Sequence, residues 1–209
     1  MKILNLYSGI GGNRKLWGDE HEIVAVEWDK DIAEVYNLFF PKDKVIVTDA
    51  HKFLLDHHKE FDLIWSSPPC PTHSDIRRVG VQKGQYKALY PEMSLYQEII
   101  LLDNFAPLTA KFVVENVKPY YEPLIQPTAM LHRHYFWANF PIRQFEVKDD
   151  RKHQDITGSS IVYGFDLKDI GIKDKRKLLR NIVDPELGLH ILNEALNKTE
   201  IIGNQLNFV

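Results

Sequence analysis

The sequence predicts an α/β fold with a doubly wound, mostly parallel, Rossmann-like sheet, and three observations support this prediction. Short apolar runs alternate with segments of helical periodicity through the first half of the chain, as in strand–helix–strand crossover units. A glycine-rich turn at residues 8–12 directly follows the first apolar run, where α/β sheets bind ligands. Hydrophobic residues make up 44% and charged residues 26% of the 209 residues, so a core of ordinary size is expected.

The expected strands are residues 2–7, 23–27, 45–47, 61–66 and 111–115, each of them a short apolar run. Helices are expected from about Asn13 and over residues 29–39, 53–58 and 94–104, where apolar residues recur at helical spacing. An aromatic-rich strand is expected at 134–139, and residues 141–177 are polar and irregular. Residues 185–196 predict a last helix that returns to the core.

Bulk properties exclude several protein classes. No run of 18 or more apolar residues is present, and the apolar stretch at residues 1–6 is too short for a signal peptide, so we expect a cytoplasmic protein without a membrane partner. The single cysteine, Cys70, excludes an internal disulfide and a cysteine-based zinc site, and no metal is expected. A formal net charge of −3 argues weakly against a nucleic-acid partner.

Basic residues are nevertheless concentrated in two segments. Residues 71–90 hold four against one acid, Asp75; the four are Arg77, Arg78, Lys83 and Lys87. Residues 173–180 hold five basic residues against one acid. Each cluster alone is typical of a solvated surface. Two of them, one directly after Cys70, favour a face that contacts phosphates.

Three features at successive strand ends indicate an adenosine-containing cofactor. The turn at 8–12 lets the backbone approach a ligand closely. Glu27, at the end of the second strand, can accept hydrogen bonds from ribose hydroxyls, and Trp28 can lie against adenine. Asp49, after the third strand, can accept from the adenine amino group. Asp29 is expected to cap the next helix. These features do not separate a nicotinamide cofactor from S-adenosyl-L-methionine.

Two further strand ends carry reactive side chains. Pro68 and Pro69 stiffen the backbone before Cys70, which suits a nucleophile held at the mouth of a cleft, although a lone cysteine is more often a buried hydrophobe. Glu115 leaves an apolar strand, where a carboxyl group can have a raised pKa and donate a proton. A structural salt bridge is the alternative interpretation of Glu115.

Together, residues 7–12, 27–29, 68–70 and 115–117 resemble the DNA (cytosine-5-)-methyltransferases over about residues 1–140. The resemblance implies an S-adenosylmethionine-dependent methyltransferase fold. It also implies a catalytic group and a cofactor-binding group. The catalytic residues would be Cys70, Glu115, Asn116 and Arg133. The cofactor-binding residues would be Tyr7, Gly9, Gly11, Gly12, Glu27, Trp28, Asp49, Pro69 and Asn204, the last from a segment similar to the family's final motif.

The resemblance also implies a mechanism on a flipped-out cytosine in DNA. Cys70 would add to carbon 6, Glu115 would protonate or hydrogen-bond ring nitrogen 3, and carbon 5 would take the methyl group. Residues 71–93 resemble a mobile loop that closes over the base. The residues expected to touch DNA are Ser74, Arg77, Arg78, Lys83, Arg151 and Lys152.

Some positions depart from the family pattern. Asn5 stands where an acid is common and Pro71 where glutamine is common, and the His132-Arg133-His134 motif holds one arginine. The chain is expected to divide into a cofactor-binding and catalytic domain (1–140), a short target-recognition region (141–178) and a returning C-terminal segment (179–209). Because about forty residues is little for target recognition, an accessory protein would fit.

Three alternatives stay open on sequence alone. The same chemistry could act on tRNA, a different donor could be used, or the chain could be a catalytically silent cofactor- or DNA-binding module. Retention of both Cys70 and Glu115 argues against the silent module. Methylation of an exocyclic amine is disfavoured, because those enzymes place Asp or Asn before the two prolines and an aromatic residue after them, whereas here Ser67 and Cys70 stand in those places.

Overall fold

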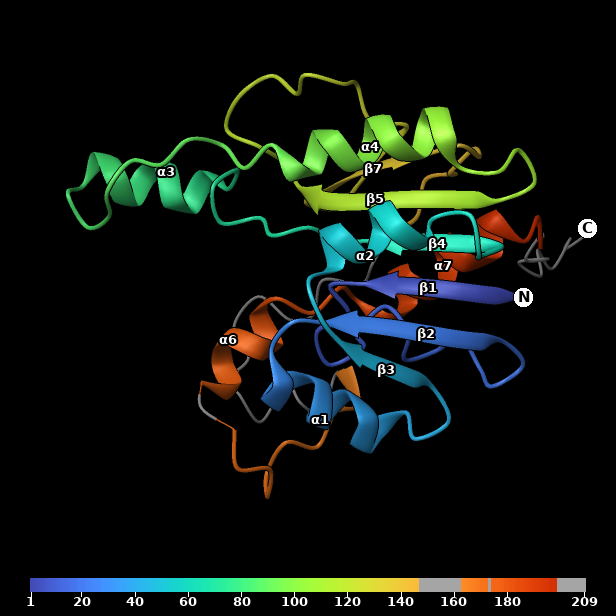
Figure 1. Cartoon of the computed structure of the whole chain (residues 1–209). Helices are drawn as coiled ribbons and strands as arrows, with labels where there is room; N and C mark the ends of the chain where they lie inside the picture. Colours follow the sequence, from blue (N-terminus) through green and yellow to red (C-terminus); the bar gives the residue numbers. More distant parts are fainter. Residues whose placement is uncertain (147–162, 173, 199–209) are drawn as a thin grey trace, which may run out of the picture.

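The computed structural model describes residues 1–146, 163–172 and 174–198. In this part of the chain seven strands form one sheet of order β3-β2-β1-β4-β5-β7-β6 (Figure 1). The strands are β1 Lys2–Leu6, β2 Glu22–Glu27, β3 Lys44–Val47, β4 Leu63–Ser66, β5 Lys111–Val117, β6 Ala129–Leu131 and β7 His134–Ala138. β1 to β5 are parallel, and β7 runs antiparallel to both β5 and β6. Chain order reverses between β1 and β4, where open α/β sheets bind ligands.

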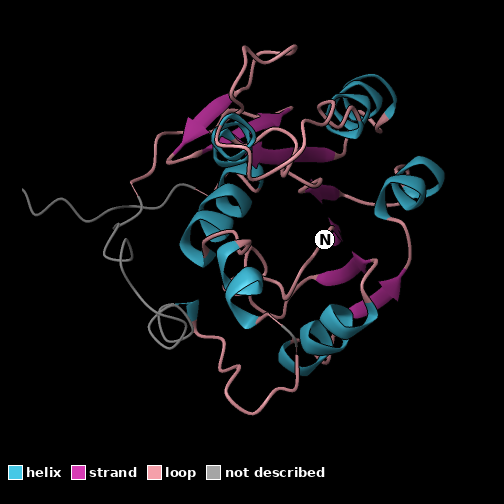
Figure 2. Cartoon of the chain, turned by 90° about the vertical axis from the view of Figure 1, so that its left-hand side faces the viewer, coloured by secondary structure: helices cyan, strands magenta, loops and turns pink. Residues whose placement is uncertain are grey.

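Helices cover both faces of the sheet (Figure 2). They are α1 Lys30–Phe39, α2 Ala50–His57, α3 Asp75–Gln82, α4 Ser94–Phe105, α6 Lys175–Arg180 and α7 Pro185–Ala195. α2 and α4 contribute to one core cluster, whereas α1 and α7 contribute to clusters on the opposite face. The Rossmann-like, doubly wound fold is confirmed.

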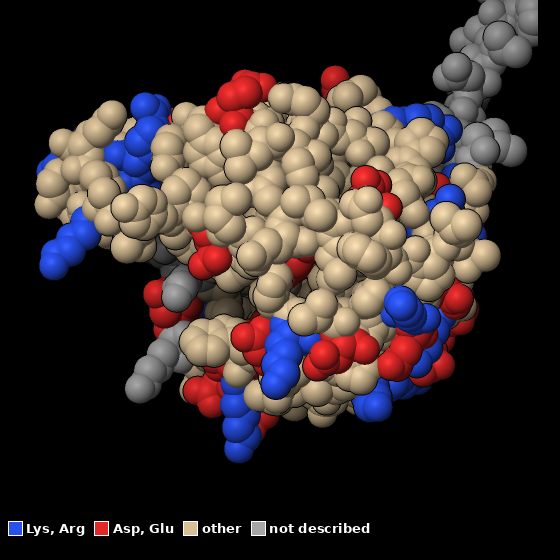
Figure 3. Space-filling model, turned by 45° about the horizontal axis from the view of Figure 1, so that its top comes forward, with Lys and Arg blue, Asp and Glu red and all other residues tan. Residues whose placement is uncertain are grey.

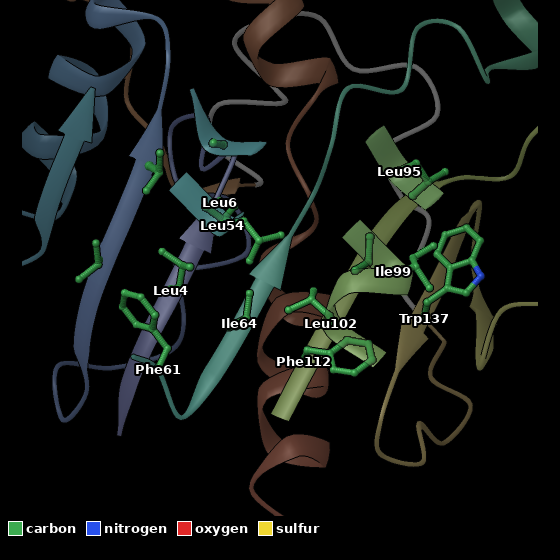
Figure 4. Close-up of a cluster of buried hydrophobic side chains, with 14 of the residues drawn as sticks. Leu4, Leu6, Leu54, Phe61, Ile64, Leu95, Ile99, Leu102, Phe112 and Trp137 are labelled. Carbon is green, nitrogen blue, oxygen red and sulfur yellow. The ribbon is translucent and has the colours of Figure 1, made fainter. Parts of the chain in front are cut away.

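The alternation of side chains along β1 shows how the two faces are built. Leu4 and Leu6 point into the cluster shared with α2 and α4, while Ile3 points into the cluster shared with α7. In the first cluster Ile99 and Leu102 of α4 lie against the sheet, as Figure 4 shows. These side chains are at most 4% exposed, and each stabilises the fold by roughly 1.5–3 kcal/mol.

The last helix packs against the turn that follows β1. The indole nitrogen of Trp17 donates a hydrogen bond to the carbonyl oxygen of Gly188 at 3.0 Å. A Cβ atom at Gly188 would come within 2.3 Å of the carbonyl oxygen of Asn13, so only glycine allows this approach. The prediction that this helix returns to the core is confirmed.

Two sequence expectations need correction. The helix expected from about Asn13 is a pair of single turns, in which Lys15 and Trp17 donate to carbonyls three residues back. Gly18, with φ of +76°, ends this segment before a full helix can form. Within 71–93, expected as a loop, residues 75–82 form α3, capped by the side chain of Ser74.

Most other elements follow their expected boundaries, but α2 begins three residues earlier than expected, and α6 (Lys175–Arg180) was not expected. Asp29 caps α1 by accepting from the amides of Asp31 and Ile32, as expected. β6 was not expected; its three residues pair only with β7. No helix in residues 1–146, 163–172 and 174–198 is both long and apolar enough to cross a membrane. Within the same residues no three His, Cys, Asp or Glu side chains gather in a way that could hold a metal ion.

A buried ion pair joins the turn after β1 to the loop after α1. Arg14 donates to both carboxylate oxygens of Asp43, at 2.9 and 3.1 Å, and Tyr36 donates to the same carboxylate at 2.7 Å. The Arg14 and Asp43 side chains are only 4% and 3% exposed. The carboxylate therefore compensates a guanidinium that could not be buried alone.

We expect Asp43→Ala to lower the free energy of unfolding by about 3–5 kcal/mol, because it leaves the Arg14 charge buried and unpaired. Urea unfolding followed by circular dichroism measures the change. Asp19→Ala is the matched control, since Asp19 contacts the same guanidinium at 3.5 Å from an exposed position, where water screens the pair, and its replacement should change stability far less. Equal losses in the two variants would contradict the assignment.

Candidate active site

The side chains expected to carry chemistry meet at one edge of the sheet. β1, β2, β4 and β5 are parallel, so their carboxyl ends lie on one side, and α3 projects on that side (Figure 1). The surface is hollowed on the same side, below the lobe that carries α3 (Figure 3). The sites are described in order from β1 to β5.

The turn after β1, residues 7–12, is called the cofactor turn. Tyr7 and Gly9 have φ of +55° and +54°. A Cβ atom on Gly9 would meet nothing within 4 Å, so this glycine borders open space. A Cβ atom on Gly11 would lie 2.3 Å from the ring of Phe40, and one on Gly12 would lie 2.4 Å from Ile182. Gly9 thus leaves room for a ligand, whereas Gly11 and Gly12 are required by packing.

Glu27 is fixed at the end of β2 by backbone amides. One carboxylate oxygen accepts from the amides of Trp28 and Asp29, at 3.0 and 3.1 Å, and the other accepts from Gly9 at 3.0 Å. Burial raises the pKa of Glu27, and the three amide hydrogen bonds oppose the rise. A carboxylate offers about four acceptor positions, so one remains for a ligand hydroxyl.

The other two expected cofactor contacts differ in their surroundings. Trp28 is 76% exposed, so its indole is available for stacking against a ligand ring. Asp49 caps α2 by accepting from the amide of Lys52 at 3.1 Å. This cap explains Asp49 structurally and still leaves its second carboxylate oxygen for a ligand.

The loop after β4, residues 67–70, is called the nucleophile loop, and Asn116 holds it against β5. The Asn116 side-chain amide donates to the carbonyl oxygen of Pro68 at 2.9 Å, while its oxygen accepts from the amide of Val117. Pro69 is exposed and Cys70 is partly buried. Asn116 is therefore a positioning residue for the segment that carries Cys70.

Glu115 is buried at the end of β5, with 6% of its surface exposed. Burial raises its pKa to about 7, against the opposing effects of a hydrogen bond from Ser67 and the charge of Arg133. Burial also raises the pKa of the Cys70 thiol, and the Glu115 charge adds to this rise while Arg133 opposes it. The Glu115 carboxylate therefore lies near enough to the Cys70 thiol for its charge to act on it. The side chain of Arg133 is exposed and acts on both through its charge.

The family model of C-5 cytosine-specific DNA methylases matches residues 1–123, more than half of the chain. The chain belongs to this family. The matched range contains the cofactor turn, Glu27, the nucleophile loop and Glu115. No curated protein sequence matches the chain.

The chain also resembles solved structures at low similarity. The PH0226 protein of Pyrococcus horikoshii is 21% identical with a TM-score of 0.39, over 56% of this chain and 49% of that one. A mutant of Spodoptera frugiperda DNMT2 is 28% identical with a TM-score of 0.37, over 56% and 35%. An Agrobacterium tumefaciens SAM-dependent methyltransferase is 17% identical with a TM-score of 0.42, over 58% and 40%. The present chain thus spans less than half of each of these three chains.

A buried carboxylate, missed in the sequence, joins the cofactor turn to the end of β4. Glu98 of α4 is 0% exposed. It accepts hydrogen bonds from the hydroxyls of Tyr7 and Ser66, each at 2.5 Å, and lies 2.9 Å from Nδ1 of His51. The hydrogen bond to Glu98 raises the pKa of His51. Helical periodicity alone assigned Glu98 to no role, because only the fold brings β1, β4 and α2 to it.

Residues 71–93, called the arm, form a hairpin that projects beyond β5 (Figure 1). The return segment packs on α3 through Tyr86, whose ring fills the space that a Cβ atom on Gly80 would need. Arg77 lies over the Tyr86 ring at 5.4 Å and donates to the carbonyl oxygen of Lys87. Figure 3 shows Lys and Arg side chains on this projecting lobe.

The residues expected to contact DNA fall into two groups. Ser74, Arg77, Arg78 and Lys83 all lie on the arm; Ser74 caps α3, and Arg78 pairs with Asp75 at 2.8 Å. Arg151 and Lys152 lie outside the described residues, as does Asn204. In the described part, the segment that lies against the cofactor turn is instead 182–183, next to Gly12. Phe165, from the expected recognition region, packs in the core beside α1.

We expect Gly9→Ala and Gly12→Ala to separate ligand binding from folding. Gly12→Ala should lower the free energy of unfolding by about 1–3 kcal/mol, because the added methyl overlaps Ile182 and the Val183 carbonyl. Gly9→Ala places its methyl in open space but at a φ of +54°, where alanine is strained by roughly 1–2 kcal/mol, and in addition it should weaken the stabilisation by S-adenosylmethionine, measured against the variant's own ligand-free midpoint. Thermal unfolding with and without this ligand measures both effects. The interpretation fails if Gly9→Ala keeps the full ligand-induced shift.

Proposed function

We propose that this chain transfers a methyl group from S-adenosyl-L-methionine to carbon 5 of cytosine in DNA, through a covalent adduct of Cys70 at carbon 6. The observation that carries the proposal is the pair of Cys70 and buried Glu115 at neighbouring strand ends, beside the cofactor turn. A nucleophilic thiol and a carboxyl group that keeps its proton near neutral pH are what this chemistry needs.

The residues of the cofactor turn and β2 fit the adenosine part of S-adenosylmethionine. Gly9 borders open space, Glu27 has an acceptor position left, and the Trp28 indole is exposed. The Ser8 hydroxyl is buried and has no hydrogen-bond partner among the described residues, so a ligand could satisfy it. Bound there, S-adenosylmethionine would supply an electrophilic methyl group on a sulfonium.

The chain's own residues would perform the remaining steps. Cys70 loses its proton, and its Sγ forms a bond to carbon 6 of the pyrimidine. Glu115 donates its proton or a hydrogen bond to ring nitrogen 3, so the electron pair displaced from the 5,6 double bond is available at carbon 5 for attack on the methyl group. Loss of the carbon-5 proton to solvent then restores the double bond and expels Cys70 as a thiolate. Ring nitrogen 3 returns its proton to Glu115, and Cys70 Sγ regains a proton from solvent.

The arm supports DNA as the substrate. Carbon 6 is covered in a stacked duplex, so the base has to leave the helix to reach Cys70. The arm begins at Pro71, directly after the nucleophile, and its basic side chains can neutralise phosphates on either side of the extruded nucleotide. We propose that target recognition uses the arm and residues 141–178, with an accessory protein as a further contributor.

The test is methyl transfer from labelled S-adenosylmethionine to unmethylated DNA and, separately, to tRNA, with Cys70→Ala alongside. We expect label in DNA as 5-methylcytosine and none with the variant. Label in tRNA alone would replace DNA as the substrate and keep the chemistry. Absence of transfer to either, with cofactor binding retained, would overturn the proposal.

A further inference from the structure

Glu98 occupies a core position of α4, although its side chain is a carboxylate. Leu95, Ile99 and Leu102 form the stripe of α4 that packs on the sheet (Figure 4). Residue 98 belongs to the same stripe, three positions after Leu95 and four before Leu102. Glu98 is 0% exposed, and a buried carboxylate is costly unless it is hydrogen-bonded. Its partners therefore explain why an apolar side chain does not stand there.

These partners come from both sides of the point where the strand order reverses. Leu6 of β1 and Ser66 of β4 are register partners, and beyond them the chain diverges into the cofactor turn and the nucleophile loop. One oxygen of Glu98 accepts from the Ser66 hydroxyl and the other from the Tyr7 hydroxyl. The second oxygen also lies 2.9 Å from Nδ1 of His51, the one ion pair that Glu98 makes with the described residues. A single carboxylate thus bridges the ends of two adjacent strands.

Tyr7 has an unusual backbone conformation, which this contact supports. In a regular strand consecutive side chains point to opposite faces, so Tyr7 would point away from the face that Leu6 occupies. Both side chains instead pack against the cluster shared with α2 and α4, in keeping with the φ of +55° at Tyr7. Residues other than glycine rarely adopt this region, and they keep it only where surrounding contacts fix it. The hydrogen bond to Glu98 is such a contact.

The conformation of Tyr7 sets the direction of the residues that follow it. The amide of Ser8 donates to the carbonyl oxygen of Val26 at 3.1 Å, and the amide of Gly9 donates to the carboxylate of Glu27 at 3.0 Å. These two hydrogen bonds attach the cofactor turn to the end of β2. A different backbone direction at Tyr7 would therefore displace Gly9 from Glu27.

We propose that Glu98 is a positioning residue: by holding Tyr7 and Ser66 together, it fixes the cofactor turn relative to the nucleophile loop. The inference rests on the proposed function, which assigns this turn to S-adenosylmethionine and this loop to the nucleophile. Because Glu98 is 0% exposed, it acts through its neighbours and not on a ligand. Methyl donor and nucleophile have to be held in register, since a displacement of about 1 Å can cost on the order of 10²-fold in rate.

The first measurement is the affinity for S-adenosylmethionine by titration calorimetry, in Glu98→Leu and in Glu194→Leu. Glu194 is the matched control, because it is a glutamate of α7 that is 6% exposed and paired with Arg143 at 2.8 Å. We expect the Kd to rise by about 10- to 100-fold in Glu98→Leu, the effect of losing hydrogen bonds to a charged group. The Kd of Glu194→Leu should stay close to that of the unmodified protein.

Amide hydrogen exchange without ligand separates positioning from a general loss of stability. In Glu98→Leu the amides of Ser8 and Gly9 should exchange faster, while the amides inside β5 keep their protection. Faster exchange throughout the protein would give Glu98 a general structural role and overturn the inference. Unchanged exchange at Ser8 and Gly9 would overturn it as well.

A second variant covers the case in which Glu98→Leu does not fold. The triple variant Tyr7→Phe, Ser66→Ala and Glu98→Leu removes both buried hydroxyls together with the carboxylate, so neither hydroxyl is left without its partner. We expect the same local increase in exchange at Ser8 and Gly9, and full protection there would contradict the role of Glu98. If the unmodified protein binds no S-adenosylmethionine, the proposed function fails, whereas the exchange measurement still decides the role of Glu98.

Discussion

Replacement of Cys70 by alanine is expected to reduce methyl transfer by on the order of 10⁴–10⁶-fold, the range seen when a covalent nucleophile is removed. The physical reason is that carbon 5 of cytosine becomes nucleophilic only after a group has added to carbon 6. DNA containing 5-fluorocytosine measures the same step directly. After methyl transfer, carbon 5 carries fluorine in place of the proton that is normally lost. The 5,6 double bond therefore cannot form again, so Cys70 stays bound and the complex survives denaturation.

The control for this prediction uses the fact that Cys70 is the only cysteine. Alkylation with iodoacetamide therefore reports on Cys70 alone, and its rate follows the thiolate fraction. Because burial and the Glu115 charge raise the pKa of the thiol, alkylation of the free protein should increase only at clearly alkaline pH. A trapped complex formed by Cys70→Ala would show that another nucleophile acts.

Replacement of Glu115 by glutamine is expected to lower kcat by about 10²–10⁴-fold, the usual contribution of a positioned acid. The pKa of Glu115 is raised to about 7, so the unmodified enzyme should lose its donor as pH rises through about 7. Cys70 requires the opposite trend, since its thiolate increases with pH. The pH profile of kcat/KM should therefore be bell-shaped, with limbs that belong to the coupled pair.

Glu115→Gln should be less active than the unmodified protein but more stable at alkaline pH. Glu115 has a folded-state pKa above its unfolded value, so its contribution to stability is present below about 4.5 and is lost as pH rises through about 7. Glu115→Gln removes this loss, and we expect it to unfold at a higher urea concentration than the unmodified protein at pH 8. A variant that is both fully active and no more stable at pH 8 would contradict the role given to Glu115.

Much of the fold could be predicted because its elements are local patterns. The parallel strands are short apolar runs, and the cap at Asp29 and the last helix follow from residue type and spacing. The turns after Asn13 could not be distinguished from a helix by periodicity. Their end depends on the positive φ of Gly18 and on packing against Gly188, which lies far away in the sequence.

In the candidate site, too, the residues that could be predicted are those marked by a local sequence pattern. Cys70, Glu115, Glu27 and the cofactor turn were recognisable because each ends a predicted strand. Glu98 was not, since it lies inside a helix and meets Tyr7, Ser66 and His51 only in the folded chain. The sequence could not separate Gly9 from Gly11 and Gly12 either, because the difference lies in what surrounds each Cα atom.

The contact between α7 and the turn after β1 also has a consequence for folding. Trp17 and Gly188 are 171 positions apart, and 182–183 lies directly against Gly12. A nascent chain that has emerged from the ribosome only as far as β5 already contains the cofactor turn, the nucleophile and the acid, but lacks the helix that covers this turn. Loop closure over such a separation is slow, so the turn at residues 8–17 is expected to gain protection from amide hydrogen exchange among the last in refolding.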